Sequence, residues 1–232
     1  MDAFLSFHAP GFWLVLTLLT GVIVLGVRPY LPRSVQPWSI SGYWALLPYL
    51  ALITGGVSPR LMGVMYIDWR TSLVLGVGLA LAMVALAGVA RISLLSSQRS
   101  TSEDVASVQS PGRLMGGMGM SGIEEWFWCF LRGAMEETLR LSQLSPDIPA
   151  YWAIWIAAAL ALPFLLLNQS NAYHQLVKGA ILVMTSILFF YTRNFWLCWA
   201  VHAITWLLLA QPASVRVAST GRSQAPRSPQ RE

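Results

Sequence analysis

One segment of the chain, Ile123–Leu141, reads IEEWFWCFLRGAMEETLRL and mixes six charged side chains with large apolar ones. A charged group near the centre of a bilayer costs about 2.5–3.5 kcal/mol on insertion scales. A helix of this composition is therefore stable in two settings. It lies on a membrane surface, where its charges touch water, or inside a helical bundle, where they pair with each other and face neighbouring helices.

The chain as a whole is poor in charged residues. Of 232 residues, 11% are charged and 56% are hydrophobic, and the mean hydropathy is +0.58. A soluble domain is about 25% charged. So little polar surface excludes a water-soluble globule and predicts an integral membrane protein.

Apolar runs flank the charged segment on both sides. A helix needs about 20 residues to cross a hydrocarbon layer of about 30 Å. Six runs approach that length: Phe12–Val27, Gly42–Val57, Thr71–Ala90, Ala150–Leu167, Val177–Tyr191 and Phe195–Ala210. We therefore predict an all-α, polytopic helical membrane protein of about seven spans, one of which is the short charged helix Ile123–Leu141.

Composition divides the chain into four parts. Residues 1–90 are predicted to form N-terminal membrane helices, and residues 91–122, rich in Ser, Gln, Gly and Met, a polar mobile linker. Residues 123–211 are predicted to form a C-terminal helical core that carries the functional site. The basic tail, residues 212–232, is predicted to be disordered.

The basic residues test whether Ile123–Leu141 crosses the membrane. If it does, ten Lys and Arg residues lie on the side of the C-terminal tail and three on the other side; if it does not, the split is seven against six. Basic residues collect on the cytoplasmic side, so the first arrangement is favoured. It predicts a multi-pass protein of the cell membrane, with the tail and residues 91–122 in the cytoplasm and the N-terminus outside.

Ionisable side chains in or beside the predicted spans are candidates for function, because a membrane makes them costly. Glu136 and Glu137 lie near the end of their helix, where the helix dipole disfavours acids, and Arg140 follows one turn later. His202 lies in the middle of an apolar run, and His174 in a polar stretch between two spans. Carboxylates and imidazoles together suit activation of water by general acid–base catalysis.

No cofactor or metal is predicted, although His and carboxylate groups can bind divalent cations. The zinc-protease pattern His-Glu-x-x-His does not occur, and the two cysteines, Cys129 and Cys198, lie in apolar runs. The basic residues are scattered at membrane boundaries, which predicts no nucleic-acid binding. The predicted partners are the lipid bilayer and a membrane-associated protein or peptide.

The C-terminal run Tyr191–Ala203, YTRNFWLCWAVHA, resembles the last motif of the CPBP family of intramembrane glutamic endopeptidases, also called the CAAX prenyl protease 2 or bacteriocin-processing family. In that family a short turn with Tyr and Arg leads into a helix that carries a His-Ala pair. The stretch Met62–Arg70 and the Gly-rich span after it also look like part of the family. The resemblance covers about residues 60–210.

The family's first motif, Glu-Glu-x-x-x-Arg, has two counterparts. The pair Glu136–Glu137 is followed by Arg140, one position early, whereas the pair Glu124–Glu125 has Cys129 where the Arg belongs and Arg132 three positions on. The distance to the following span favours Glu136–Glu137 as the family's pair, and Glu124–Glu125 stays the alternative.

The other two motifs also depart from the family. Asn168 stands where the second motif has a His, and His174 follows six residues later. Trp206 stands where the family has an Asn, four residues after the last His.

The resemblance implies a metal-independent glutamic endopeptidase that cleaves a membrane-associated peptide or protein. In that scheme Glu136 activates water with the help of His174, Glu137 and Arg140 shape the site, and His202 stabilises the oxyanion. The departures favour an alternative, a catalytically inactive member of the fold that acts as a membrane interaction or assembly protein. A transporter with a proton relay is a third interpretation, against which the halves show no inverted repeat.

Overall fold

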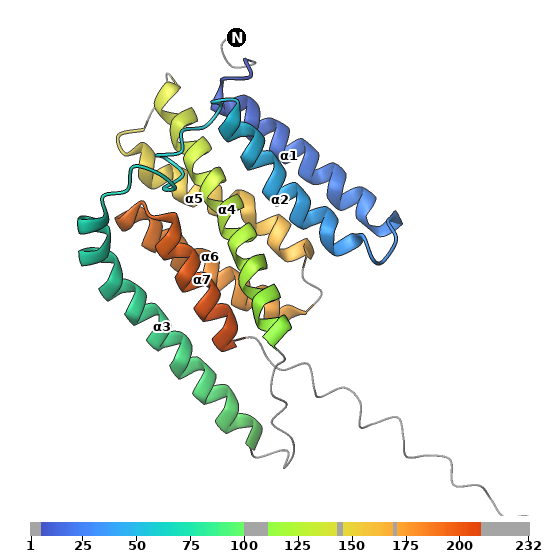
Figure 1. Ribbon diagram of the computed structural model, residues 1–232, viewed down its shortest axis with the longest axis vertical. Coiled ribbons are helices and arrows are strands. Elements are labelled where there is room, and N and C mark those ends of the chain that lie inside the picture. Colours follow the sequence, from blue (N-terminus) through green and yellow to red (C-terminus); the bar gives the residue numbers. More distant parts are fainter. Residues whose placement is uncertain (1–5, 100–110, 143–145, 169–170, 210–232) are drawn as a thin grey trace, which may run out of the picture.

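The computed structural model describes residues 6–99, 111–142, 146–168 and 171–209, and in these ranges the chain forms seven α-helices and one 3-10 turn (Figure 1). The elements are α1 (Pro10–Val27), η1 (Arg28–Tyr30), α2 (Gln36–Ile53), α3 (Trp69–Arg99), α4 (Pro111–Leu141), α5 (Pro149–Asn168), α6 (Ala172–Thr192) and α7 (Phe195–Leu209). The prediction of an all-α fold is confirmed. The tail predicted at 212–232 lies outside the described residues.

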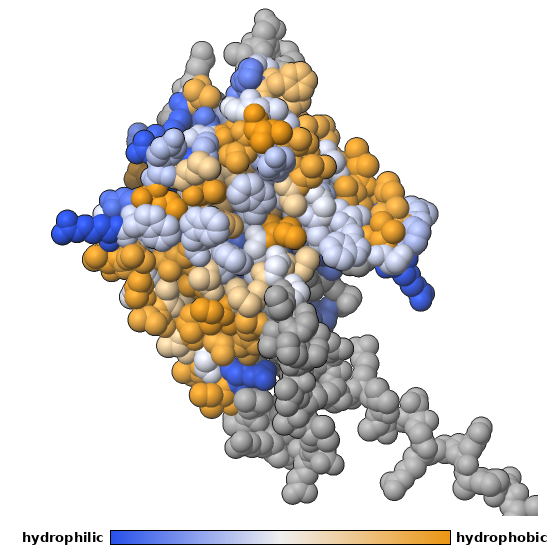
Figure 2. Space-filling view, in the orientation of Figure 1, coloured by the Kyte–Doolittle hydropathy of each residue, from blue (hydrophilic) through white to orange (hydrophobic). Residues whose placement is uncertain are grey.

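Among the described residues, four helices are long and apolar enough to cross a membrane, namely α1, α3, α5 and α6. The apolar parts of α2 and α7 are shorter. Apolar residues cover much of the face seen in Figure 2, and side chains such as Val74 and Leu81 of α3 are 75% and 65% exposed. Exposed apolar side chains in such number are stable against lipid rather than water, which indicates a membrane protein.

Helix α4 lies in the middle of the bundle and packs against α1, α2, α5 and α7, while α3 lies outside, against α6 and α7 (Figure 1). The ring of Phe127 in α4 packs on Trp44 and Phe164, with centroid distances of 5.8 and 6.1 Å. The charged side chains of Glu125 and Arg132 are 0% and 1% exposed. The charged segment is therefore a central helix of the bundle, and these two charges face its neighbours.

The linker predicted at 91–122 is helical at both ends. Helix α3 continues to Arg99 and α4 already begins at Pro111, so only residues 100–110 lie outside the described part of this segment. A polar composition indicates a loop only where no neighbour stabilises a helix, and here the last part of the segment packs against α7.

Glycines in α4 permit that packing. A Cβ atom at Gly122 would lie 3.0 Å from Nε1 of Trp199, and one at Gly117 would lie 3.6 Å from Nε1 of Trp206. The Trp199 indole also donates to the carbonyl of Met118 at 3.3 Å. The Gly-rich start of α4 is therefore helical because α7 covers it, against the low helix propensity of glycine.

The loop from 54 to 68 ties α2 and α3 to the turn before α7. Gly63 has a positive φ of 69°, and its carbonyl accepts from the Phe195 amide at 2.9 Å. A Cβ atom at Gly63 would lie 2.7 Å from the Arg193 carbonyl oxygen. This position therefore needs glycine for its backbone conformation and for its close approach to the turn.

Candidate functional site

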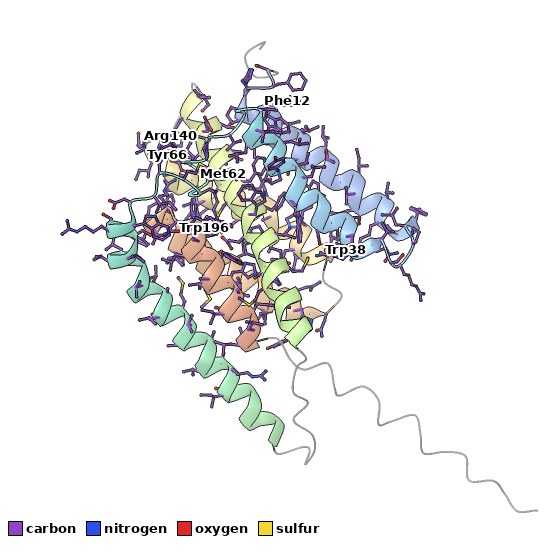
Figure 3. The ribbon with its side chains drawn as sticks, in the orientation of Figure 1. Phe12, Trp38, Met62, Tyr66, Arg140 and Trp196 are labelled. Carbon is purple, nitrogen blue, oxygen red and sulfur yellow. The ribbon has the colours of Figure 1, made fainter. Side chains whose placement is uncertain are left out.

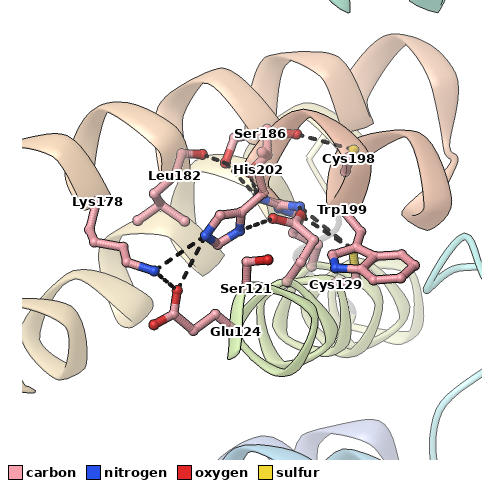
Figure 4. A network of polar contacts seen from close by, with 12 residues as sticks. Ser121, Glu124, Cys129, Lys178, Leu182, Ser186, Cys198, Trp199 and His202 are labelled. Carbon is pink, nitrogen blue, oxygen red and sulfur yellow. Dashed lines mark hydrogen bonds and ion pairs between the residues drawn. The ribbon is translucent and has the colours of Figure 1, made fainter. Parts of the chain in front are cut away.

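A cluster of five ionisable side chains lies buried where α4, α6 and α7 meet (Figure 4). We call it the buried ionic cluster, and it consists of Glu124, Glu125 and Arg132 from α4, Lys178 from α6 and His202 from α7, each at most 4% exposed. Ions buried to this degree are stable only when they pair and form hydrogen bonds. Their mutual geometry therefore decides what the cluster can do.

His202 lies between the two glutamates. Its Nδ1 is 3.2 Å from Oε2 of Glu125, and its Nε2 is 3.2 Å from Oε2 of Glu124. The Lys178 ammonium is 3.4 Å from the same Nε2. Each ring nitrogen of His202 therefore faces a carboxylate oxygen, and the tautomer determines which of the two nitrogens donates its proton.

Each glutamate also has its own cation. The Arg132 guanidinium donates from Nη1 to Oε1 of Glu125 at 2.7 Å, and the Lys178 ammonium contacts Oε2 of Glu124. The charges of the two carboxylates are therefore compensated inside the bundle, which offsets the free-energy cost of removing them from water.

Hydroxyl groups of α6 hold the arginine in place. Nη2 of Arg132 donates to Oγ1 of Thr185 at 3.0 Å and to Oγ of Ser186 at 3.1 Å. Its guanidinium carbon also lies 5.3 Å from the ring centroid of Phe189. These contacts fix Arg132 and, through it, the carboxylate of Glu125.

Helical spacing in α4 explains why these groups meet. Glu125, Cys129 and Arg132 follow i, i+4 and i+7, which places them on one face. The Cys129 thiol lies 3.7 Å from Glu125 Oε1 and 3.7 Å from Arg132 Nη1. The three side chains therefore lie together on one face of α4.

A cavity of about 10 Å³ adjoins Glu124 and Lys178. Trp44, Trp128, Leu165 and Asn168 complete its lining. This volume is at the lower limit for one water molecule. Asn168 stands at the position where the CPBP motif has a His, and it lines this cavity together with Glu124.

The predicted catalytic residues of α4 do not belong to this cluster. Glu136 lies eleven residues after Glu125 on the same helix, which is about 16 Å along its axis. Its carboxylate is held by Arg140, at 2.7 Å from Nη2, and by Arg193. The Glu137 carboxylate instead accepts from the Ser58 amide at 3.0 Å.

His174 also lies apart from the glutamates, and it is in a helix rather than in the predicted loop. The Asn171 side chain accepts from the Tyr173 amide at 2.9 Å and so caps α6 before His174. The His174 ring packs on Trp206, 5.6 Å between centroids, and the Lys178 ammonium lies 4.2 Å from the centroid of the same indole. His202 is thus the one predicted catalytic residue in the cluster.

Sequence reasoning missed the role of Lys178. It counted this residue among the cytoplasmic basic residues, whereas the structure buries it, 3% exposed, against Glu124. The available signal was that the single lysine of the chain lies inside a predominantly apolar run.

Comparisons of the chain with known protein families, curated proteins and solved structures identify no match.

Proposed function

We propose that this chain is a divergent intramembrane glutamic endopeptidase of the CPBP type, which cleaves a membrane-associated peptide or protein with water activated by Glu124. One observation carries the proposal. Oε2 of Glu124 lies 3.2 Å from Nε2 of His202, next to a cavity of the size of one water molecule. The water-activating role that the sequence resemblance gave to Glu136 thereby passes to Glu124.

The geometry supports a direct hydrolytic sequence. The Glu124 carboxylate takes a proton from water while the water oxygen attacks the carbonyl carbon of the scissile amide. The Lys178 ammonium stabilises the oxyanion that forms. The proton then passes to the leaving amine nitrogen, either from Glu124 or from Nε2 of His202, as the carbon–nitrogen bond breaks.

The remaining residues of the cluster position these groups. In this mechanism His202 is the Nδ1–H tautomer, which donates to Glu125 at 3.2 Å and keeps Nε2 directed at Glu124. Arg132 holds Glu125 in turn. The family resemblance supports the same assignment, because His202 belongs to the motif Tyr191–Ala203.

A second candidate function is an inactive member of the fold that acts as a membrane interaction or assembly protein. It is favoured by the pairing of both glutamates with a cation and by their near-complete burial. In this role the ion pairs hold α4, α6 and α7 together. Asn168 supports it too, because an amide at the cavity can orient water but cannot transfer a proton.

We further propose that all seven helices cross the cell membrane, with the N-terminus outside and the C-terminal tail inside. Lys178 no longer counts as a cytoplasmic residue because it is buried in the bundle. Arg140 lies at the same end as Arg60 and Arg193, so the split is nine basic residues inside against four outside, and the asymmetry persists.

The test is cleavage of lipid-anchored, internally quenched fluorescent peptides by the full-length protein in proteoliposomes. Wild type is expected to cleave members of such a panel, and Glu124→Gln to lower the rate at least 100-fold, in line with the contribution of about 10²–10⁴ from a general base. Glu136→Gln is the matched control on the same helix and is expected to keep the rate.

Thermal unfolding of each variant shows that the compared proteins are folded. Full activity in folded Glu124→Gln would overturn the proposed mechanism. A wild-type protein that cleaves no peptide of the panel would instead support the second candidate.

A further inference from the structure

A larger cavity, about 380 Å³, opens at the end of the bundle where α3 and α7 begin and α4 and α6 end. We call it the arginine pocket, because Arg60, Arg140 and Arg193 line it, together with the acids Asp68 and Glu136. Figure 3 labels Arg140 and Tyr66 at this end. The pocket is separate from the buried ionic cluster, none of whose members lines it.

The two acids of the pocket are already engaged. Both oxygens of Glu136 are taken, Oε1 by Arg140 and Oε2 by Arg193. The Asp68 carboxylate accepts from the hydroxyl and the amide of Thr71, at 2.7 and 3.2 Å, and so caps α3. These bonds, the one from the hydroxyl first, lower the pKa of Asp68.

The three arginines keep donors to spare. Each guanidinium has five N–H groups, of which Glu136 takes two from Arg140 and one from Arg193. Arg60 is exposed and has no carboxylate partner within the part of the chain that the structure describes. Three cations against two carboxylates leave the pocket with a net positive charge, and the remaining guanidinium N–H groups can donate to an anion.

Backbone strain is concentrated at the same pocket. Among the described residues, Tyr66 and Arg193 are the two that are not glycine and have a positive φ, 57° and 49°, and both line the cavity. Position 193 is the C-cap of α6, where glycine or asparagine is usual. Such strain persists where surrounding contacts impose it and is typical of binding sites.

Neutralisation of Glu136 does not explain this arrangement, because Arg140 alone satisfies one buried carboxylate. A second arginine, Arg193, is nevertheless held in a strained conformation at the same carboxylate, and a third, Arg60, joins them from the loop before α3. Converging guanidinium groups match the oxygens of a phosphate, which they bind in a bidentate manner.

We propose that the arginine pocket binds a phosphoryl group at the membrane boundary. In the proposed topology, on which this proposal rests, the helix ends at this level lie at the depth of lipid headgroups. Its volume of about 380 Å³ lies in the range of small-ligand sites. Two sources supply this chemistry, the headgroup of a phospholipid and free inorganic phosphate, and the experiment separates them.

The experiment is a titration of the full-length protein in non-ionic detergent, followed by native mass spectrometry. The lipid probes are phosphatidylglycerol and, without phosphate, diacylglycerol of the same acyl chains. Arg60→Gln is the principal variant, since Arg60 has no ion pair in the described structure whose loss would unfold the protein. Arg193→Gln is the second variant, and Arg33→Gln, an exposed arginine outside the pocket, is the control.

We expect Arg60→Gln and Arg193→Gln each to weaken phosphatidylglycerol binding at least tenfold, while Arg33→Gln binds like wild type and diacylglycerol binding is unchanged throughout. Titration with inorganic phosphate alone, followed by calorimetry, identifies the source. Binding that depends on Arg60 assigns free phosphate, and its absence assigns the lipid headgroup. Equal phosphatidylglycerol binding by wild type and both pocket variants, or no binding of either phosphate probe, overturns the proposal.

Discussion

The imidazole of His202 stacks on the indole of Trp128, with 4.9 Å between ring centroids and 12° between ring planes. Both rings are buried, and Trp128 also lines the small cavity beside Glu124. The indole thus fixes the plane of the imidazole in which Nδ1 and Nε2 reach the two glutamates. The rotamer of His202 is set by packing as well as by its polar contacts.

Trp128→Leu should therefore disturb both stability and the orientation of His202. Truncation of a buried large side chain costs about 3–5 kcal/mol in the extreme case of alanine, and we expect roughly half of that for leucine. Thermal unfolding and peptide cleavage measure the two effects. Trp38→Leu, at a site that is 72% exposed, is the control and should change neither; an equal effect at both positions would contradict this role.

Arg132→Met should destabilise the protein strongly, because it leaves Glu125 buried without its cation. Loss of one partner from a buried pair costs about 3–5 kcal/mol. Arg140→Met removes an arginine whose side chain is 56% exposed, and Glu136 keeps Arg193 as a second cation, so we expect a smaller loss of about 1 kcal/mol. The free energy of unfolding in detergent measures the difference.

Adding Glu125→Gln to Arg132→Met should recover part of the lost stability, since the uncompensated charge is then gone. The free energies of unfolding of the two single variants and the double variant are compared. If the loss in the double variant equals the sum of the two single losses, the side chains are not coupled, which would contradict the ion pair.

Gly63→Ala should destabilise the loop before α3. The positive φ of Gly63 and the 2.7 Å approach of its Cβ position to the Arg193 carbonyl oppose any side chain, and strain of this kind costs about 1–3 kcal/mol. Gly78→Ala in α3 meets no atom within 4 Å and should stabilise the helix by about 0.5–1 kcal/mol. Thermal unfolding should move the two variants in opposite directions.

Single-cysteine labelling tests the proposed topology. The native Cys129 and Cys198 are both 0% exposed, so an impermeant maleimide has little background. On intact cells it should label Met65→Cys, in the exposed loop between α2 and α3, and leave Ser34→Cys unlabelled until the membrane is opened. Labelling of Ser34→Cys alone would reverse the orientation.

The helices could be predicted from the sequence because a membrane imposes simple demands of length and apolarity. The run Phe12–Val27 corresponds to α1 within two residues at its start, and the charged segment Ile123–Leu141 ends where α4 ends. The start of α4 could not be predicted in this way. Its glycines and methionines form a helix through packing on α7, a tertiary contact that composition does not encode.

The site was predictable in part. His202 could be identified as an ionisable group inside an apolar run, but local spacing did not choose between two glutamate pairs that each have an arginine nearby. What separates them is the level at which α6 and α7 pass α4. Lys178 and His202 contact α4 at Glu124, and Glu136 lies further along the same helix, near its C-terminal end.

The partners of Glu124 come late in the chain. Lys178 follows it by 54 residues, which at roughly 5–20 residues per second takes a ribosome about 3–11 seconds to add. Glu125 has Arg132 within the same helix, whereas Glu124 lacks its cation until α6 has been made. If α4 crosses the membrane as proposed, its stable insertion is therefore expected to coincide with the arrival of α6.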